Sequence, residues 1–332
     1  MVLAAVILAG LIALAVSRLN LSGIGHALIT ASLGWIAAAL VLMASSLLLR
    51  SLSWDRTLRA ALPTTPITWP PVMRATMIGV MASALFPGRI GEPTRVLVLS
   101  RRLEGPTRTL LPVIAGTVFS QTLINLLALG ILLAATFTSV PIFHGHVAAI
   151  GAALIVPATV AAVIVFGPRV VALGRRSHSL RVVAAASALE RLLGLVRSGL
   201  RAFARPRYGV PAVGFQLAAW ALQWLSCYAV ILALGLEPHA DVATAAAILL
   251  AVNLSAILPA TPSNVGVFQA ACVVVLAAYG IGAAEGVAYG LILQAVEVVT
   301  ALGMGIPALL GEGLHWRDLR PRRADSAGDG AD

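Results

Sequence analysis

Lysine is absent from this 332-residue chain, and charged residues of every kind are scarce. They make up 11% of the sequence, whereas an ordinary soluble domain carries roughly a quarter. Hydrophobic residues make up 59%, which leaves too little polar surface for a protein surrounded by water. The composition therefore excludes a soluble globular protein and predicts an integral membrane protein whose solvent is lipid.

Because lysine is absent, the net charge of +10 comes from arginine alone. Most arginines lie in four clusters, at residues 50–59, 89–108, 169–207 and 317–323. Basic clusters also occur in nucleic-acid-binding proteins, but here each borders an apolar stretch, as cytoplasmic flanks of membrane helices do. We therefore expect no nucleic-acid partner. The pattern predicts a multi-pass protein of the cell membrane with both termini in the cytoplasm.

Cysteine and clustered metal ligands are also scarce. Cys227 and Cys272 lie in apolar runs and are predicted to be small buried hydrophobes rather than a disulfide or a redox pair. His144 and His146 have no neighbouring carboxylate or thiol that would complete a metal site. We expect no metal ion and no cofactor.

Several apolar stretches have the composition of full membrane-spanning helices. They are residues 2–16, 33–54, 109–140, 147–166, 209–236 and 283–310. The basic, amphipathic segment 169–207 is expected to lie along the membrane surface. Residues 1–316 would form a single transmembrane domain, and the polar residues 317–332 a disordered cytoplasmic tail.

Two further apolar segments, residues 71–103 and 241–279, are broken in the middle by proline and glycine. Each half is shorter than the roughly 20 residues that a span needs, and the breaks favour a reversal of the chain. Arginines flank the first segment on both sides and are absent around the second. The predicted architecture is all-α and polytopic, with about six full transmembrane helices and two re-entrant hairpins that enter from opposite faces.

The first break reads FPGRIGEPTR over residues 86–95. A charge facing lipid at this depth would cost about 2.5–3.5 kcal/mol, so Arg89, Glu92 and Arg95 must be paired or hydrated. Glu92 can neutralise one arginine, and the amides of the half-helix beginning at Gly91 add a positive end. The local excess of positive charge favours an anion, here a lipid phosphate. The alternative is a closed network that only pins the hairpin.

The second break is uncharged. Its candidate residues are Pro262, Ser263, Asn264, Gly266 and Gln269, which could bind a lipid head group or only satisfy freed backbone groups. Weaker candidates are Gln121, Asn125, Gln294 and Glu297. The first two share a helix face, as do the last two, and polar side chains commonly join membrane helices. Glu297 differs in being a lone acid well inside the last span.

The stretches LFPGRIGEPTRVLVLSRR and PATPSNVGVFQAACVVVLAAYG resemble the lysylphosphatidylglycerol synthase transmembrane-region family, in a stand-alone form. The likeness covers approximately residues 33–310. Carried onto this sequence, the first family motif falls on Pro87, Gly88, Arg89, Gly91, Glu92 and Arg95, and the second on Pro262, Gly266 and Phe268. The resemblance implies that a charged or glycosylated lipid is translocated across the bilayer.

The chain departs from the family pattern at several charged positions. Gln121, Thr122 and Asn125 stand where the family often has Glu-Arg and a following Asp, and Gln294 stands where it often has an arginine. In the second hairpin Asn264, Val265 and Gln269 stand where the family often has a Gly-Gly turn and then Glu. These replacements put a proton- or ion-coupled drive in doubt. No lysyl-transfer domain follows in this sequence, so synthesis of lysylphosphatidylglycerol is not implied.

The sequence thus predicts a lipid transporter rather than an enzyme. Arg89 and Arg95 would hold the phosphate of an anionic phospholipid or a polyprenyl-phosphate-linked lipid, while Pro87, Gly88, Gly91 and Glu92 shape the site. One alternative is a membrane enzyme acting on such a lipid, for which Glu92 is the sole candidate base. Another is a scaffold that binds a synthase of the cell envelope.

Overall fold

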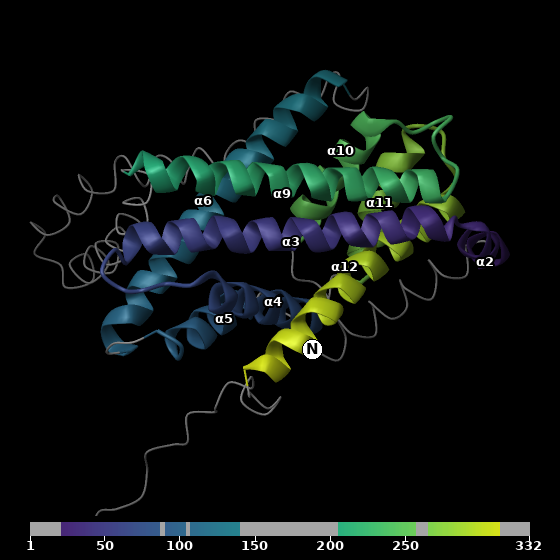
Figure 1. The fold of residues 1–332 in the computed structure, drawn as a ribbon. Helices are drawn as coiled ribbons and strands as arrows, with labels where there is room; N and C mark the ends of the chain where they lie inside the picture. The colour runs from purple at the N-terminus through teal and green to yellow at the C-terminus, as the bar shows by residue number, and fades with distance from the viewer. Residues whose placement is uncertain (1–20, 87–89, 104–106, 140–204, 257–264, 313–332) are drawn as a thin grey trace, which may run out of the picture.

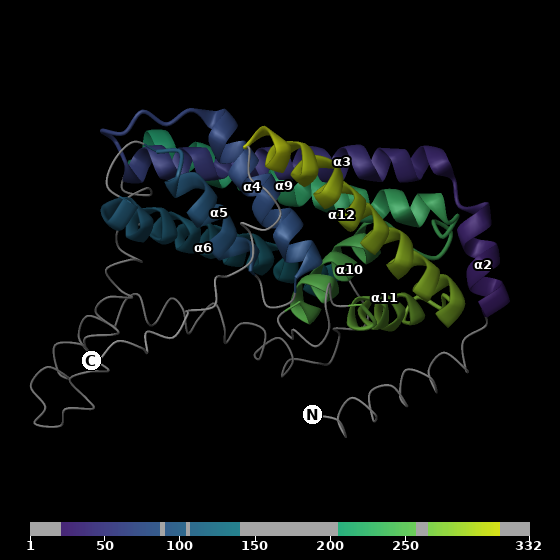
Figure 2. The ribbon, with the colours of Figure 1, turned by 90° about the horizontal axis from the view of Figure 1, so that it is seen from below.

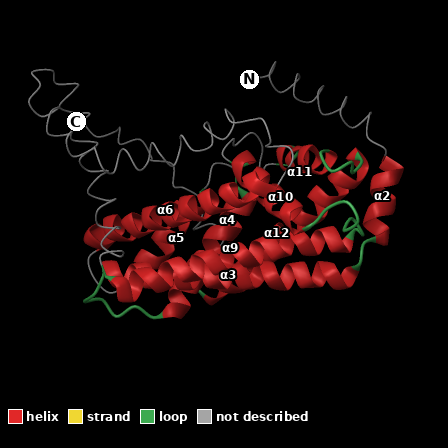
Figure 3. Ribbon diagram, turned by 90° about the horizontal axis from the view of Figure 1, so that it is seen from above, coloured by secondary structure: helices red, strands yellow, loops and turns green. Residues whose placement is uncertain are grey.

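The computed structural model describes residues 21–86, 90–103, 107–139, 205–256 and 265–312 (Figure 1). Within these ranges every regular element is an α-helix (Figure 3). The helices are α2 (Leu21–Thr30), α3 (Leu33–Ala61), α4 (Trp69–Leu85), α5 (Gly91–Ser100), α6 (Thr107–Ser139), α9 (Pro206–Ala233), α10 (Val242–Ser255), α11 (Val267–Ala277) and α12 (Ala283–Gly311). The prediction of an all-α fold is confirmed.

Four of these helices are long and apolar enough to cross a membrane. Their candidate spans are Leu33–Ala61, Leu110–Leu133, Pro206–Ala233 and Ala283–Gly311. They correspond to four predicted spans, so the protein is a multi-pass membrane protein. The other predictions for whole segments, at residues 2–16, 147–166, nearly all of 169–207 and 317–332, lie outside the described residues. The domain division, the cell membrane as location and the cytoplasmic termini stay predictions.

Helix α3 continues past residue 54, where the sequence analysis ended the span. Asp55 is buried, and Arg59 on the next turn donates to its carboxylate at 2.8 Å. Ser51 and Thr57 donate to carbonyl groups three residues earlier, at 2.7 and 2.8 Å. The polar side chains are thus satisfied within the helix, which runs to Ala61. The expectation that Arg50 flanks the span was wrong, because Arg50 lies about 16 Å inside it at 1.5 Å per residue.

Helices α3 and α9 are antiparallel and lie side by side (Figure 1). The amide of Ser32 donates to the carbonyl of Ala233 at 2.7 Å, where α3 begins and α9 ends. Further along the pair, Ser226 donates to Ala39 O at 2.9 Å and Ser53 to Ala212 O at 2.8 Å. Small buried residues let the two backbones approach closely, as is usual between membrane helices.

The two broken segments form pairs of short helices, α4 with α5 and α10 with α11. Their lengths are 17, 10, 14 and 11 residues, below the roughly 20 needed to span a bilayer. The open end of the first pair meets the C-terminal end of α12, whereas α10 starts beside the C-terminal half of α9. Figures 1 and 2 show α5 and α11 toward opposite ends of the bundle. Two opposed hairpins are therefore present, as predicted.

The second pair begins at a capping box. The amide of Thr244 donates to Asp241 Oδ1 at 2.9 Å, and the amide of Asp241 donates to Thr244 Oγ1 at 3.2 Å. The hydrogen bond from the Thr244 amide lowers the pKa of the Asp241 carboxyl. A capping aspartate of this kind fixes where α10 begins.

The first pair crosses tightly at two glycines. A Cβ atom on Gly91 would overlap the carbonyl oxygen of Gly79 and the hydroxyl of Ser83. A Cβ atom on Gly79 would lie 2.9 Å from the carbonyl oxygen of Gly91. Glycine is therefore required at this crossing by close backbone approach.

We expect Gly91→Ala to destabilise the protein by about 1–3 kcal/mol, because the added methyl group must push α4 and α5 apart. The loss is measured as a lower midpoint of thermal unfolding in detergent. Gly130→Ala is the matched control, since a Cβ atom there meets no atom within 4 Å. Equal midpoints for the two variants would show that the crossing is loose.

Candidate functional site

Arg95 lies on α5, one turn after the helix begins, and contacts three helices. Its guanidinium forms an ion pair with Glu92 on the same helix. It also donates to Gln121 Oε1 of α6 at 2.8 Å and lies over the ring of Trp54 of α3, 4.9 Å from its centroid. The Arg95 side chain is only 11% exposed, whereas that of Glu92 is 50% exposed. Arg95 is therefore held inside the bundle with its counter-ion at the edge.

Gln121 connects Arg95 to a second buried arginine. Its oxygen accepts the hydrogen bond from Arg95, and its Nε2 donates to the backbone carbonyl of Arg50 at 3.1 Å. The side chain of Arg50 donates to Gln223 of α9 and lies 5.9 Å from the ring centroid of Trp220. Helices α3, α5, α6 and α9 thus converge on two arginines.

A second polar group extends this cluster along α6 and α9. Asn125 Oδ1 accepts hydrogen bonds from Gln216 at 2.6 Å and from the indole of Trp220 at 3.0 Å. The weaker candidates Gln121 and Asn125 therefore both face the interior. They form the α6 side of the arginine cluster.

The charge of Arg95 is balanced by direct contact, whereas that of Arg50 is balanced only at a distance. Glu92 pairs directly with Arg95, whereas Glu297 of α12 interacts electrostatically with Arg50. Among the described residues no carboxylate lies within 4.0 Å of the Arg50 guanidinium. The two arginines also repel each other. An anion placed between them would relieve that repulsion.

Each arginine also has one buried donor atom that is available to a ligand. The Nε atoms of Arg50 and Arg95 are buried and have no hydrogen-bond partner among the described residues. A buried donor without a partner costs about 1–3 kcal/mol, and anionic oxygens are the acceptors that guanidinium groups bind most strongly. The arrangement is suited to an oxyanion such as a phosphate group.

The described part of the second break has a structural role. Gly266 adopts φ +90°, a left-handed conformation that favours glycine. Its amide donates to Gln269 Oε1 at 2.7 Å, and Gln269 Nε2 donates to Gln294 Oε1 of α12 at 2.5 Å. Gln269 thus satisfies the start of α11 and ties it to Gln294 of α12, and the binding of a lipid head group at this break stays a prediction.

Several predicted site residues lie outside the described residues. They are Pro87, Gly88, Arg89, Pro262, Ser263 and Asn264. The pairing of Arg89 with Arg95 around a phosphate stays a prediction. In the described residues the second arginine near Arg95 is Arg50, which the sequence analysis assigned to a flanking cluster.

A pattern on α9 could have revealed Arg50. Gln216, Trp220 and Gln223 recur at spacings of four and three, so they share one helix face inside an apolar span. Two amides on one face of a membrane helix need polar partners on a neighbour. Arg50 and Asn125 supply them.

The comparisons with known proteins agree with this architecture. The family model described as lysylphosphatidylglycerol synthase TM region matches residues 1–305, which includes both pairs of short helices and most of α12. No individual curated protein matches the chain.

Proposed function

Because the chain belongs to the lysylphosphatidylglycerol synthase TM region family, a membrane domain of lipid metabolism, we propose that it transports lipid. It binds an anionic, phosphate-bearing lipid inside the bundle and moves it between leaflets. The lipid is an anionic phospholipid or a polyprenyl-phosphate-linked lipid, which share the phosphate group that the site recognises.

The observation that carries this proposal is the pair of buried arginines, Arg50 and Arg95. Each charge at bilayer depth costs about 2.5–3.5 kcal/mol if it faces lipid. Of the two, Arg95 alone has a carboxylate in contact within the described residues. A phosphate between them would accept from both guanidinium groups and from their free Nε donors. Glu92 sets the orientation of Arg95 from the edge of the site.

The two opposed pairs of short helices provide a path for the lipid phosphate across the bundle. Broken helices at membrane depth occur where irregular backbone is buried in protein or lines a cavity, and in transporters substrate sites lie where such breaks meet. Arg95 lies one turn from the first break, and Gln269 lies at the second. We propose that the lipid phosphate moves between these two breaks.

The interactions of the two acidic residues, Glu92 and Glu297, favour transport over catalysis. Glu92 is held in an ion pair with Arg95, so it is not free to act as a general base. Glu297 is separated from direct contact with Arg50 and balances its charge. The site as built binds an anion without positioning a nucleophile.

The proposal is tested by reconstituting the protein in vesicles that contain a fluorescent phosphatidylglycerol in both leaflets. An impermeant reductant bleaches the outer leaflet, and the loss of the protected inner fraction reports transfer. We expect faster loss with the protein than in empty vesicles, and a smaller increase for fluorescent phosphatidylcholine. A fluorescent polyprenyl phosphate is the parallel substrate. Rates equal to those of empty vesicles for both anionic lipids would refute transport.

A further inference from the structure

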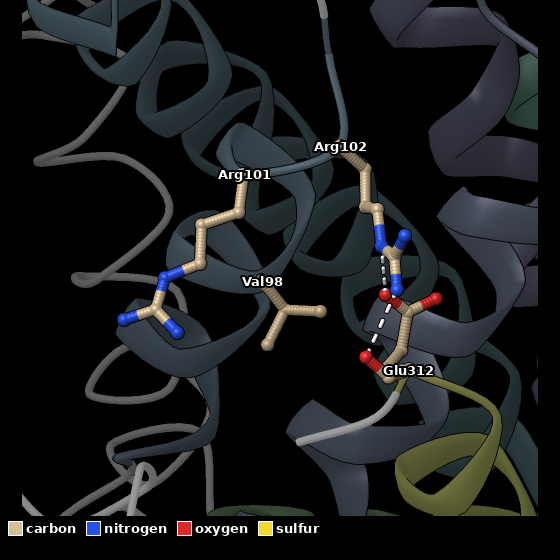
Figure 4. A pocket seen from close by; sticks show the side chains of 4 residues that line it. All are labelled: Val98, Arg101, Arg102 and Glu312. Atoms are coloured by element: carbon tan, nitrogen blue, oxygen red, sulfur yellow. Dashed lines mark hydrogen bonds and ion pairs between the residues drawn. The ribbon is translucent and has the colours of Figure 1, made fainter.

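A second cluster of arginines lies outside the interior site, at the open end of the α4–α5 pair. A pocket of about 170 Å³ is lined there by Val98, Arg101, Arg102 and Glu312 (Figure 4). The first three residues lie at the C-terminal end of α5, and Glu312 caps the C-terminal end of α12.

Glu312 is the acid that organises this pocket, and its carboxylate forms ion pairs with two arginines. Its side chain is 2% exposed and forms ion pairs with Arg74 at 3.2 Å and with Arg102. The same arginines also bind backbone carbonyls, Arg74 that of Gly311 at 3.3 Å and Arg102 that of Glu312 at 2.9 Å. The end of α12 is therefore clamped between the two helices of the first pair.

The pocket keeps an excess of positive charge. Arg74 and Arg102 share the single carboxylate of Glu312, and Arg101 adds a further positive charge to the pocket lining. The side chain of Arg101 is exposed and forms no hydrogen bond or ion pair in the part of the chain that the structure describes. Figure 4 shows its side chain directed away from the Arg102–Glu312 pair. Arg102 remains 46% exposed although it is paired.

We propose that this pocket binds the phosphate group of an anionic lipid at the membrane surface. Arg101 and the exposed side of Arg102 donate to the phosphate oxygens, and the buried Glu312 fixes Arg102 in place. The same phosphate chemistry could come from a soluble phosphate ester. Leu97 lies one helical turn before Arg101 on α5 and exposes its apolar side chain. An exposed apolar side chain beside the pocket favours a lipid over a soluble phosphate ester.

The pocket and the interior site lie along the same helix, α5. Arg101 follows Arg95 by six residues, so it lies about 9 Å further along the same helix axis. A lipid held at the pocket is therefore close to the interior arginines. Binding here does not depend on transport, and the pocket would bind phosphate even if the interior site did not.

The experiment uses the full chain in nanodiscs with a photoactivatable phosphatidylglycerol whose reactive group lies in the head group. Adducts are mapped by peptide mass spectrometry to the ends of α5 and α12. We expect Arg101→Gln to lower the yield at limiting lipid about ten-fold, the loss of one charge-assisted hydrogen bond. Arg207→Gln, which removes an exposed arginine stacked on Tyr208, should leave the yield unchanged.

Two further arms use the unaltered protein, so they do not depend on the folding of a variant. High salt should reduce the adduct at the pocket, because the site is exposed and charged. Excess glycerol 3-phosphate should not reduce it if the ligand is the lipid, and should abolish it if a soluble ester is preferred. Equal adducts from a matched phosphatidylcholine probe, or from Arg101→Gln, would overturn the proposal.

Discussion

Replacing Arg95 by glutamine is expected to lower the affinity for anionic lipid by roughly ten- to a hundred-fold while the protein stays folded. The loss corresponds to one charged hydrogen bond, worth about 1.5–3 kcal/mol. Folding should survive because glutamine can still bond to Gln121, and because Glu92 is half exposed and can be hydrated once its partner is gone. Lipid retention by native mass spectrometry and thermal unfolding in detergent measure the two quantities.

Two companion variants separate a binding role from a structural one. Arg95→Lys should restore only part of the affinity, because an ammonium group cannot grip two oxygens in one plane. Glu92→Gln should lower the unfolding midpoint yet retain lipid, since it removes negative charge from a site that recognises an anion. If Arg95→Gln and Glu92→Gln lower the midpoint equally and leave bound lipid unchanged, Arg95 only pins the hairpin.

The long helices could be predicted because hydropathy alone defines them. Stretches of about 20 apolar residues have few alternatives in a bilayer, and the four described spans follow the predicted ones closely. The two broken segments could also be predicted, because proline and glycine interrupt runs too short to span. In both cases the deciding physical term is local in the sequence.

The position of Arg50 could not be predicted by the same reasoning. Hydropathy treats an arginine near the end of an apolar run as a flank, so Asp55 and the arginines beside it marked the end of α3. Asp55 is instead buried against Arg59, and nearby hydroxyl groups bond back to the helix. These contacts lie within α3 itself, whereas the place of Arg50 beside Gln223 and Trp220 depends on how α3 packs against α9. No helix was expected over residues 21–30, where α2 forms.

The candidate site, like the fold, could be predicted from the sequence only in part. That Glu92 and Arg95 lie on one helix face follows from their spacing of three. That Gln121 joins Arg95 to the backbone of Arg50 depends on three helices meeting at one depth. The charge excess could thus be inferred from the sequence, whereas the second arginine required the fold.

Arg50→Gln should destabilise the protein by about 1–3 kcal/mol, because it removes the donor to Gln223 and weakens the electrostatic interaction with Glu297, which Arg50 does not contact. The same substitution should reduce binding of anionic lipid. Either effect alone is ambiguous, since an unstable protein also binds poorly. A double variant with Glu297→Gln separates them, because it removes both charges together.

We expect Arg50→Gln/Glu297→Gln to recover part of the lost stability, since neither charge is left buried without a partner. It should still bind anionic lipid weakly, because the guanidinium that would hold the phosphate is absent. Glu297→Gln alone should bind anionic lipid more tightly than the unaltered protein, since Arg50 then lacks a counter-charge. Unfolding midpoints and lipid retention of all four proteins complete the cycle. A double variant that retains lipid as well as the unaltered protein would assign Arg50 to folding alone.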